Sequence, residues 1–286
     1  MAEAVRTCRV GGHALAYRRK GEGEPLLLVH GLGTHSFLWA EVLELLAGRF
    51  DVIAVDLLGC GASEKPLDVS YALGDHAERL ATFLRALGIA KLHVAGHGVG
   101  SGIALLLAAR APQRIRSLTL VNPVGHDLWP GLPIAALRAP VVRSLLFGAL
   151  RRWTLGPLVR RAMYHREKVT SALLAEFLEP LATEAGRRAL VLFARSLDAA
   201  HLPSRAELGH LLDVRTTIAW GLADPFLSLS IAERLQQDIP GSRLVALREA
   251  SHLVPLDAPA ALARILEETA GCTQPAEAEN LMVRSA

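Results

Sequence analysis

Cysteine is scarce in this chain of 286 residues, which contains only Cys8, Cys60 and Cys272. Because the number is odd, the spacing is wide and no C-x-x-C pair occurs, the sequence excludes a disulfide framework and offers no zinc-finger spacing. It also shows no other cluster of metal ligands and no phosphate-binding loop, so we expect neither a metal nor a cofactor. Such cysteine usage is typical of a reducing compartment, and we expect a cytoplasmic protein.

An excess of charge of one sign is missing as well. Lys and Arg together number 31 against 28 for Asp and Glu. A nucleic-acid-binding protein would need basic residues clustered on one face, so the overall balance gives no case for a nucleic-acid partner.

Long apolar runs are also absent. The N-terminus has no apolar run of signal-peptide length, so we do not expect secretion. The longest apolar stretch, residues 94–109, contains His97 and four glycines. It falls short of the roughly 20 residues that cross a bilayer, so we expect a buried core segment and no transmembrane span.

What is present is a sequence with 51% hydrophobic residues, enough for a large core, in which strand-like and helix-like stretches alternate. Two strands joined by a turn, residues 5–10 and 14–20, predict an antiparallel start. Further strands are expected at residues 25–30, 51–57, 92–95, 115–121, 216–220 and 243–248, and helices at 37–47, 73–87, 103–109, 231–237 and 259–269. This alternation predicts an α/β fold with a mostly parallel central sheet and helices on both faces.

The alternation pauses between residues 125 and 210. This stretch has helix-like segments broken by prolines and no clear strand signal. We therefore expect a helical cap inserted into the core, with residues 1–124 and 211–270 forming the two parts of the core. Residues 271–286 are polar and aperiodic, and we expect a flexible tail there.

The most informative stretch is residues 91–110, which predicts a strand, a sharp glycine-rich turn and a helix. In hydrolases that use a nucleophile elbow, this turn reads G-x-S-x-G, and the strained serine is exposed at its tip. Here the turn reads Gly96-His97-Gly98-Val99-Gly100. Gly98 occupies the position of the nucleophile, and a residue without a side chain cannot form an acyl-enzyme.

Five motifs occur in order along almost the whole chain: HGLG at residues 30–33, DLLGCGASEKP at 56–66, GHGVG at 96–100, GLADP at 221–225 and SHLVPLDAP at 251–259. On these motifs the chain resembles the α/β-hydrolase superfamily, with glycine in place of the elbow nucleophile.

The resemblance implies a role for each matching residue. It makes Asp224 the acid and His252 the base of a triad whose nucleophile position, Gly98, is vacant. It places an oxyanion hole at the backbone N–H groups of Leu32 and Val99, which needs no side chain. The candidates for substrate binding are Gly31, His35, His97 and Trp39, although the two histidines would fit a packing role as well.

Other nucleophiles and other ligands are less well supported. Ser101 lies a turn down the helix from the elbow tip, and Cys60 and Ser63 are more typical of residues that shape a loop. The segment Gly96-x-Gly98-x-x-Ser101 lacks the third glycine of a dinucleotide-binding loop. The next strand ends at Asn122 without the acidic residue that would bind the ribose.

The predicted cap is rich in basic residues. Between residues 136 and 168, a single acidic residue, Glu167, accompanies eight basic ones: Arg138, Arg143, Arg151, Arg152, Arg160, Arg161, Arg166 and Lys168. The simplest interpretation is a solvated basic helix face whose apolar side covers the site. The alternatives are peripheral contact with an anionic membrane and attraction of an acidic substrate. In each case we expect a mostly apolar pocket and a small hydrophobic substrate.

Three functions are compatible with these residues. The first is an enzyme in which His252 and Asp224 act as a general base beside the oxyanion hole, for isomerisation, elimination, cyclisation, carbon–carbon bond chemistry or activation of water. The second is an ester, thioester or lactone hydrolase disabled by replacement of serine at position 98. The third is a non-catalytic ligand-binding protein. The sequence carries no signal for the oligomeric state.

Overall fold

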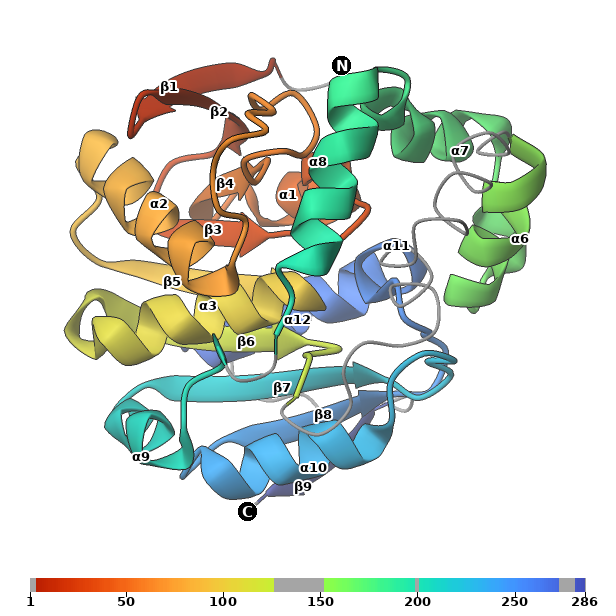
Figure 1. Cartoon of the computed structure of the whole chain (residues 1–286). Coiled ribbons are helices and arrows are strands. Elements are labelled where there is room, and N and C mark those ends of the chain that lie inside the picture. The colour runs from red at the N-terminus through yellow and green to blue at the C-terminus, as the bar shows by residue number, and fades with distance from the viewer. Residues whose placement is uncertain (1–3, 126–151, 199–200, 273–280, 286) are drawn as a thin grey trace.

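The computed structural model of the chain describes residues 4–125, 152–198, 201–272 and 281–285. These residues form a nine-stranded sheet in the order β1-β2-β4-β3-β5-β6-β7-β8-β9 (Figure 1). The strands are β1 (Arg6–Val10), β2 (His13–Lys20), β3 (Glu24–Val29), β4 (Phe50–Val55), β5 (Leu92–His97), β6 (Ile115–Val121), β7 (Arg215–Gly221), β8 (Arg243–Leu247) and β9 (Leu281–Ser285).

The central strands from β4 to β8 are parallel to one another, whereas β1, β2 and β9 run antiparallel to their neighbours. Every residue of β4 and β5 is buried. This burial is what a strand covered on both faces requires, and it explains why these strands appear in the sequence as continuous apolar runs. The predicted mostly parallel α/β sheet is confirmed.

Helices cover both faces of the sheet. Along β3, Leu27 and Val29 belong to one apolar core, and the alternate residues Leu26 and Leu28 belong to the other. The first core is completed by α2 (Leu73–Ala86), α3 (Val99–Arg110) and α10 (Leu229–Asp238). The second is completed by α1 (Ala40–Leu46) and α12 (Pro259–Ala270). Because successive strand residues point to opposite faces, a single strand contributes to both layers.

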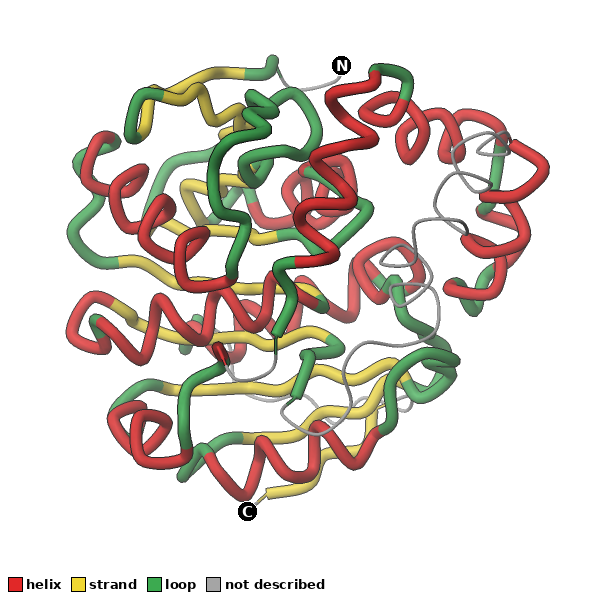
Figure 2. Tube along the Cα trace, in the orientation of Figure 1, coloured by secondary structure: helices red, strands yellow, loops and turns green. Residues whose placement is uncertain are grey.

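Between β6 and β7 the described residues form helices and no strand, as Figure 2 shows. The longer helices are α6 (Arg152–Ala162), α7 (Ser171–Leu178) and α8 (Glu184–Arg195), and a short helix, α9 (Arg205–Leu208), precedes β7. Helices α6 and α7 lie beyond one end of the sheet strands (Figure 1). Arg138, Arg143 and Arg151 of the predicted basic cap lie outside the described residues.

The end of the chain departs from the prediction. Residues 271–286 were expected to form a flexible tail, but Leu281–Ser285 form β9, which pairs antiparallel with β8 through contacts such as Val245↔Val283. Without β9, the ladder groups on one side of β8 would be unpaired. A run of five residues, LMVRS, after a polar stretch is too short to predict a strand. The strand β9 therefore forms because β8 has an open side with which it can pair.

In the described part of the chain, no helix is long and apolar enough to span a membrane.

Candidate active site

The turn between β5 and α3 has the geometry of a nucleophile elbow. Gly98 has φ 55° and ψ −118°, a conformation that residues with side chains adopt only under strain. A Cβ atom at Gly96 would collide with the backbone of Gly100, and one at Gly100 would collide with the backbone of His30. The flanking glycines therefore allow α3 to approach the ends of β3 and β5 closely.

Gly98 itself is not crowded. Among the described residues other than its chain neighbours, a Cβ atom there would have a single neighbour within 4 Å, the Nε2 atom of His252 at 4.0 Å. The space in front of Gly98 is therefore open and faces the imidazole, so a side chain at this position would point at His252.

His252 and Asp224 form a hydrogen-bonded pair. Asp224 follows β7 and His252 follows β8, and these strands are parallel neighbours, so both loops lie at the same edge of the sheet. The distance between His252 Nδ1 and Asp224 Oδ2 is 2.8 Å. A carboxylate accepts this bond, so Nδ1 carries the proton and Nε2 is left free to take one up. The Asp224 side chain is 1% exposed and that of His252 is 22% exposed.

Asp224 is held by further donors. Its Oδ1 atom accepts hydrogen bonds from the N–H groups of Phe226 (2.8 Å) and Leu227 (3.1 Å), and its Oδ2 atom accepts one from Asn122 Nδ2 (2.6 Å). Burial by itself raises the pKa of Asp224. The hydrogen bond and charge of His252, together with the Phe226 and Asn122 donors, outweigh burial and lower this pKa below its ordinary value. The carboxylate is therefore ionised at neutral pH and stabilises a protonated His252.

Asn122 is a site residue that the sequence reasoning missed. It follows β6, has φ 41°, and accepts the Gly221 N–H at 2.9 Å through Oδ1 while donating to Asp224. The available signal was a polar residue directly after a buried strand, at the edge where ligands bind in parallel sheets.

His97 supports His252 from the other side. Its Nε2 atom donates to the His252 carbonyl at 2.7 Å, and the two rings lie 5.0 Å apart at 64°. Burial, and to a lesser extent the charge of His252, lower the pKa of His97 to about 3, so its ring is neutral. His97 is 2% exposed, and its Nδ1 atom has no hydrogen-bond partner among the described residues.

The loop after β3 fixes the orientation of the peptide group between Gly31 and Leu32. The Gly31 carbonyl accepts hydrogen bonds from His30 Nδ1 (2.7 Å) and Thr34 Oγ1 (3.0 Å). In a trans peptide the following N–H points away from the carbonyl, so this anchoring fixes the direction of the Leu32 N–H. A Cβ atom at Gly31 would lie 3.0 Å from His97 Nδ1, which places this loop against the elbow. Within the described residues, the N–H groups of Leu32 and Val99 have no hydrogen-bond partner.

Two other predicted substrate-binding residues make packing contacts. His35 Nε2 lies 3.1 Å from the Glu176 carbonyl of α7, and its ring lies 4.6 Å from that of Phe37. Trp39 is fully buried in the core on the α1 and α12 side. In the described part of the chain, neither shares a hydrogen bond or ring contact with His252 or Asp224.

The other side chains considered as nucleophiles have structural partners. Ser101 is fully buried and donates to the Gly96 carbonyl. Ser63 donates to the Asp56 carbonyl at 2.6 Å and accepts from the Ala16 N–H at 2.8 Å. Burial raises the pKa of Cys60 to about 12, which disfavours the reactive thiolate.

A carboxylate connects the His252 loop to α6. Asp257 is 3% exposed and accepts hydrogen bonds from the backbone N–H groups of Ser251 (2.9 Å), Tyr164 (3.0 Å) and His165 (3.0 Å). Beside it, the N–H of Leu253 donates to the Ala162 carbonyl at 3.1 Å. The loop that carries His252 is therefore fixed to the end of α6.

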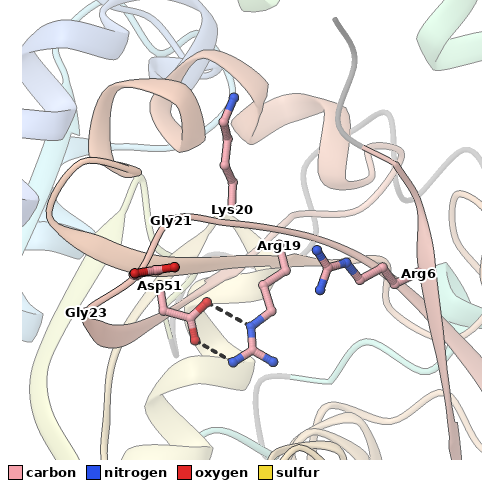
Figure 3. A pocket seen from close by; sticks show the side chains of 7 residues that line it. Arg6, Arg19, Lys20, Gly21, Gly23 and Asp51 are labelled. Atoms are coloured by element: carbon pink, nitrogen blue, oxygen red, sulfur yellow. Dashed lines mark hydrogen bonds and ion pairs between the residues drawn. The ribbon is translucent and has the colours of Figure 1, made fainter.

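Two open pockets formed by described residues, of about 320 and 340 Å³, lie at the opposite edge of the sheet, where the central strands begin. The first is shown in Figure 3, where Arg19 binds Asp51 through two hydrogen bonds of 2.8 and 2.6 Å. The second includes Glu24 and His93, near the starts of β3 and β5. Neither pocket contains a residue of the dyad or the elbow. Among the described residues, no group of three His, Cys, Asp or Glu side chains is arranged to hold a metal.

Comparison with known proteins identifies the family to which this fold belongs. A family model described as the alpha/beta hydrolase fold matches residues 24–259. An uncharacterised protein of Mycobacterium tuberculosis is 31% identical over 96% of this chain and 84% of its own length. Haloalkane dehalogenase 2 of the same organism is 30% identical over 89% of this chain and 91% of its own. The structure of a meta-cleavage product hydrolase from Pseudomonas fluorescens superposes with a TM-score of 0.81 over 92% of this chain and 96% of its own, and its 22% identity is evidence for the fold alone.

Proposed function

The chain belongs to the α/β-hydrolase family, and from this membership we propose that it is an enzyme in which His252 acts as a general base without a covalent nucleophile. The observation that carries the proposal is the open space in front of Gly98. In the described part of the chain, the near neighbour of this space is His252 Nε2, at 4.0 Å from a Cβ built on Gly98. A substrate or a water molecule placed there lies next to an atom prepared to accept a proton.

In the proposed reaction, Nε2 takes a proton from a carbon next to a substrate carbonyl, or from a water molecule. The electron pair released from the carbon–hydrogen bond moves to the carbonyl oxygen, and the imidazolium is stabilised by Asp224 at 2.8 Å. The proton on Nε2 exchanges with solvent, and a proton from Nε2 is then returned to the intermediate in the second half of the reaction. This base chemistry fits isomerisation, elimination, cyclisation, or making or breaking a carbon–carbon bond.

The oxyanion formed in this step would be stabilised by the N–H groups of Leu32 and Val99. The anchored Gly31 carbonyl supports this role for Leu32, because it fixes the N–H direction before the substrate binds. Val99 is the first residue of the 12-residue helix α3, whose N-terminus favours negative charge. Hydrogen-bond donors that are already oriented before the substrate binds stabilise the negative charge of an oxyanion most effectively.

The proposed substrate is a small, largely apolar carbonyl compound. The helices inserted between β6 and β7 would act as its cap, and Phe226 provides an apolar wall, with its ring 5.4 Å from that of His252.

The proposal is tested by incubating the protein in D₂O with a panel of small ketones, esters and thioesters, and by following deuterium at the carbon next to the carbonyl. We expect at least one compound to exchange, and H252A to slow the exchange by about 100-fold or more, the usual contribution of a general base. H210A, which alters an exposed histidine, is the control and should exchange at the wild-type rate. Exchange that persists in H252A contradicts the proposal, and binding without exchange favours a ligand-binding protein.

A second candidate function is an ordinary ester, thioester or lactone hydrolase that lost its serine. The space at position 98 specifically favours it, because the nearest described atom that a serine Cβ would meet beyond its chain neighbours is His252 Nε2, at 4.0 Å. The G98S variant would then regain ester turnover by several orders of magnitude, the scale lost when a catalytic serine is removed. A G98S variant that is inert on a broad ester panel argues against this candidate.

A further inference from the structure

The exposed side of α6 and the residues that follow it carry an excess of positive charge. Residues 155–170 contain four basic residues and one acidic residue, a net charge of +3, equal to the formal net charge of the whole chain. The remaining residues are therefore balanced.

The burial pattern places the basic residues on one side of the helix. Gly156, Val159, Ala162 and Met163 are buried, whereas Leu158, Arg160, Arg161 and Tyr164 are exposed. Residues three and four positions apart share a helix face, so the exposed residues form one surface opposite the buried ones. We call Leu158, Arg160, Arg161, Tyr164 and the adjacent exposed Arg166 the basic cap surface.

Two large apolar side chains lie among these arginines. Leu158 is 40% exposed and Tyr164 is 46% exposed. In the described part of the chain, no hydrogen bond or ion pair engages the side chains of Arg160, Arg161 or Arg166. Lys168 does not belong to this surface, because its Nζ atom binds the carbonyls of Leu256 and Asp257, each at 3.0 Å.

The basic cap surface is also rigidly mounted. The backbone N–H groups of Tyr164 and His165 are fixed by the buried Asp257 carboxylate, and Ala162 is bonded to Leu253, the neighbour of His252. The surface and the loop that carries the base are thus joined by hydrogen bonds. In Figure 1, α6 lies at the periphery of the molecule, beyond the end of the sheet strands.

We propose that the basic cap surface docks on an anionic lipid bilayer. Unpaired arginines match the negative surface potential of such a membrane, and an exposed leucine and tyrosine are the side chains that enter its interface. The occupant is specified by this combination, because an acidic protein or a nucleic acid would not require the two apolar groups. Docking would place the cap next to the apolar molecules dissolved in the bilayer, from which a substrate could reach His252. This delivery of substrate rests on the proposed function, whereas the docking does not.

The test is co-sedimentation of the full chain with vesicles of phosphatidylcholine alone and of phosphatidylcholine mixed with phosphatidylglycerol. We expect binding to the mixed vesicles only, and loss of that binding at high salt. The variant R160E/R161E/R166E should lower the partition coefficient by at least about 100-fold, since each basic residue near an anionic surface contributes several-fold. L158S/Y164S should lower it by about tenfold through loss of apolar insertion.

The matched control is R6E/R85E/K91E, which makes the same change in net charge at exposed residues outside the cap. It should bind mixed vesicles nearly as well as the wild type. H252A should also bind normally, which separates failure of docking from failure of the proposed reaction. Thermal melts confirm that each variant is folded.

Three outcomes would overturn the proposal. They are equal binding to neutral and mixed vesicles, equal loss of binding in R6E/R85E/K91E and R160E/R161E/R166E, and binding to heparin with no binding to vesicles. The last would identify a polyanionic macromolecule as the partner in place of a membrane.

Discussion

The side-chain amide of Asn122 has two partners with opposite hydrogen-bonding roles. Nδ2 donates to Asp224 Oδ2 at 2.6 Å, and Oδ1 accepts the Gly221 N–H at 2.9 Å. Both partners lie at the end of β7, so one residue after β6 fixes the strand end and the acid of the dyad. Its φ of 41° is a left-handed conformation, which Asn and Asp tolerate better than most residues.

We predict that N122D destabilises the protein in a pH-dependent way. The substitution keeps the size and the tolerance of positive φ but replaces the donor to Asp224 with a second carboxylate, and two carboxylates at this distance cannot both ionise without cost. The free energy of unfolding, measured in urea, should fall by about 1–3 kcal/mol at pH 8. The difference from the wild type should shrink near pH 5, where the new carboxyl group begins to hold a proton and can donate again. A deficit that is equal at both pH values would contradict this account.

The sequence identified individual candidate site residues, but it did not identify the residues that hold them in place. Asp224 and His252 were identified from motifs that follow two strands, and the structure brings them to 2.8 Å. Asn122 was missed because a lone asparagine after a strand usually forms a turn, and its role depends on β6 and β7 becoming neighbours. The substrate-binding role predicted for His35 and Trp39 stays a prediction, and the described contacts of these residues are with Glu176, Phe37 and the core.

At the scale of elements, Asp257 joins the His252 loop to the segment that follows α6. Its buried carboxylate accepts N–H groups from the His252 loop, at Ser251, and from the segment after α6, at Tyr164 and His165. No sequence signal distinguishes this aspartate from a helix-start or turn residue, since two of its three donors, the N–H groups of Tyr164 and His165, are 93 and 92 residues away.

We predict that D257N weakens this junction. An amide has one oxygen in place of two and presents N–H groups to other N–H groups, so buried donors lose their acceptor. The free energy of unfolding should fall by about 2–3 kcal/mol, the range for hydrogen bonds to a charged group. Limited proteolysis should cut faster near residues 162–168. D213N, at an exposed aspartate, is the matched control and should behave as the wild type. Equal stability of D257N and D213N would contradict this role for Asp257.

Strands and helices were predicted best where the apolar pattern in the sequence was longest. The largely apolar runs of β3 to β8 are strong signals because strands buried on both faces are built mostly from apolar residues. β9 was missed because its five residues follow a polar stretch and form a strand only against β8. The helical character of the insertion was predicted from the absence of strand signals, whereas the contacts of α6 and α7 with the core are non-local.

At the scale of the whole molecule, three histidines are buried in the neutral form. Burial lowers the pKa of His30 to about 4 and the pKa values of His76 and His97 to about 3, from an ordinary value of 6.5. In the unfolded chain they take up protons as the pH falls through about 6.5. The unfolded state therefore binds more protons than the folded state between about pH 6.5 and pH 4, and stability is lost as the pH falls through this range.

We predict a steep acid destabilisation from these groups. With three histidines the free energy of unfolding should fall by roughly 4 kcal/mol per pH unit in the steepest region below pH 6, at about 1.4 kcal/mol per group. Urea unfolding between pH 4.5 and 6.5 measures this slope. H76Q should reduce the slope by about a third, and H210Q, at an exposed position, should leave it unchanged. A stability that is flat across this range would contradict the assignment of neutral buried rings.

We propose that the elbow, the His252–Asp224 dyad and the N–H donors of Leu32 and Val99 surround a position, Gly98, that lacks only a nucleophile. The measurement that tests it most directly is the intact mass of wild type and G98S after treatment with a fluorophosphonate, which reacts with activated serines. We predict no adduct on the wild type, one adduct on G98S at residue 98, and labelling at least about 100-fold slower in G98S/H252A, because the histidine activates the hydroxyl. An adduct on the wild type, or a folded G98S that resists labelling, would contradict the claim.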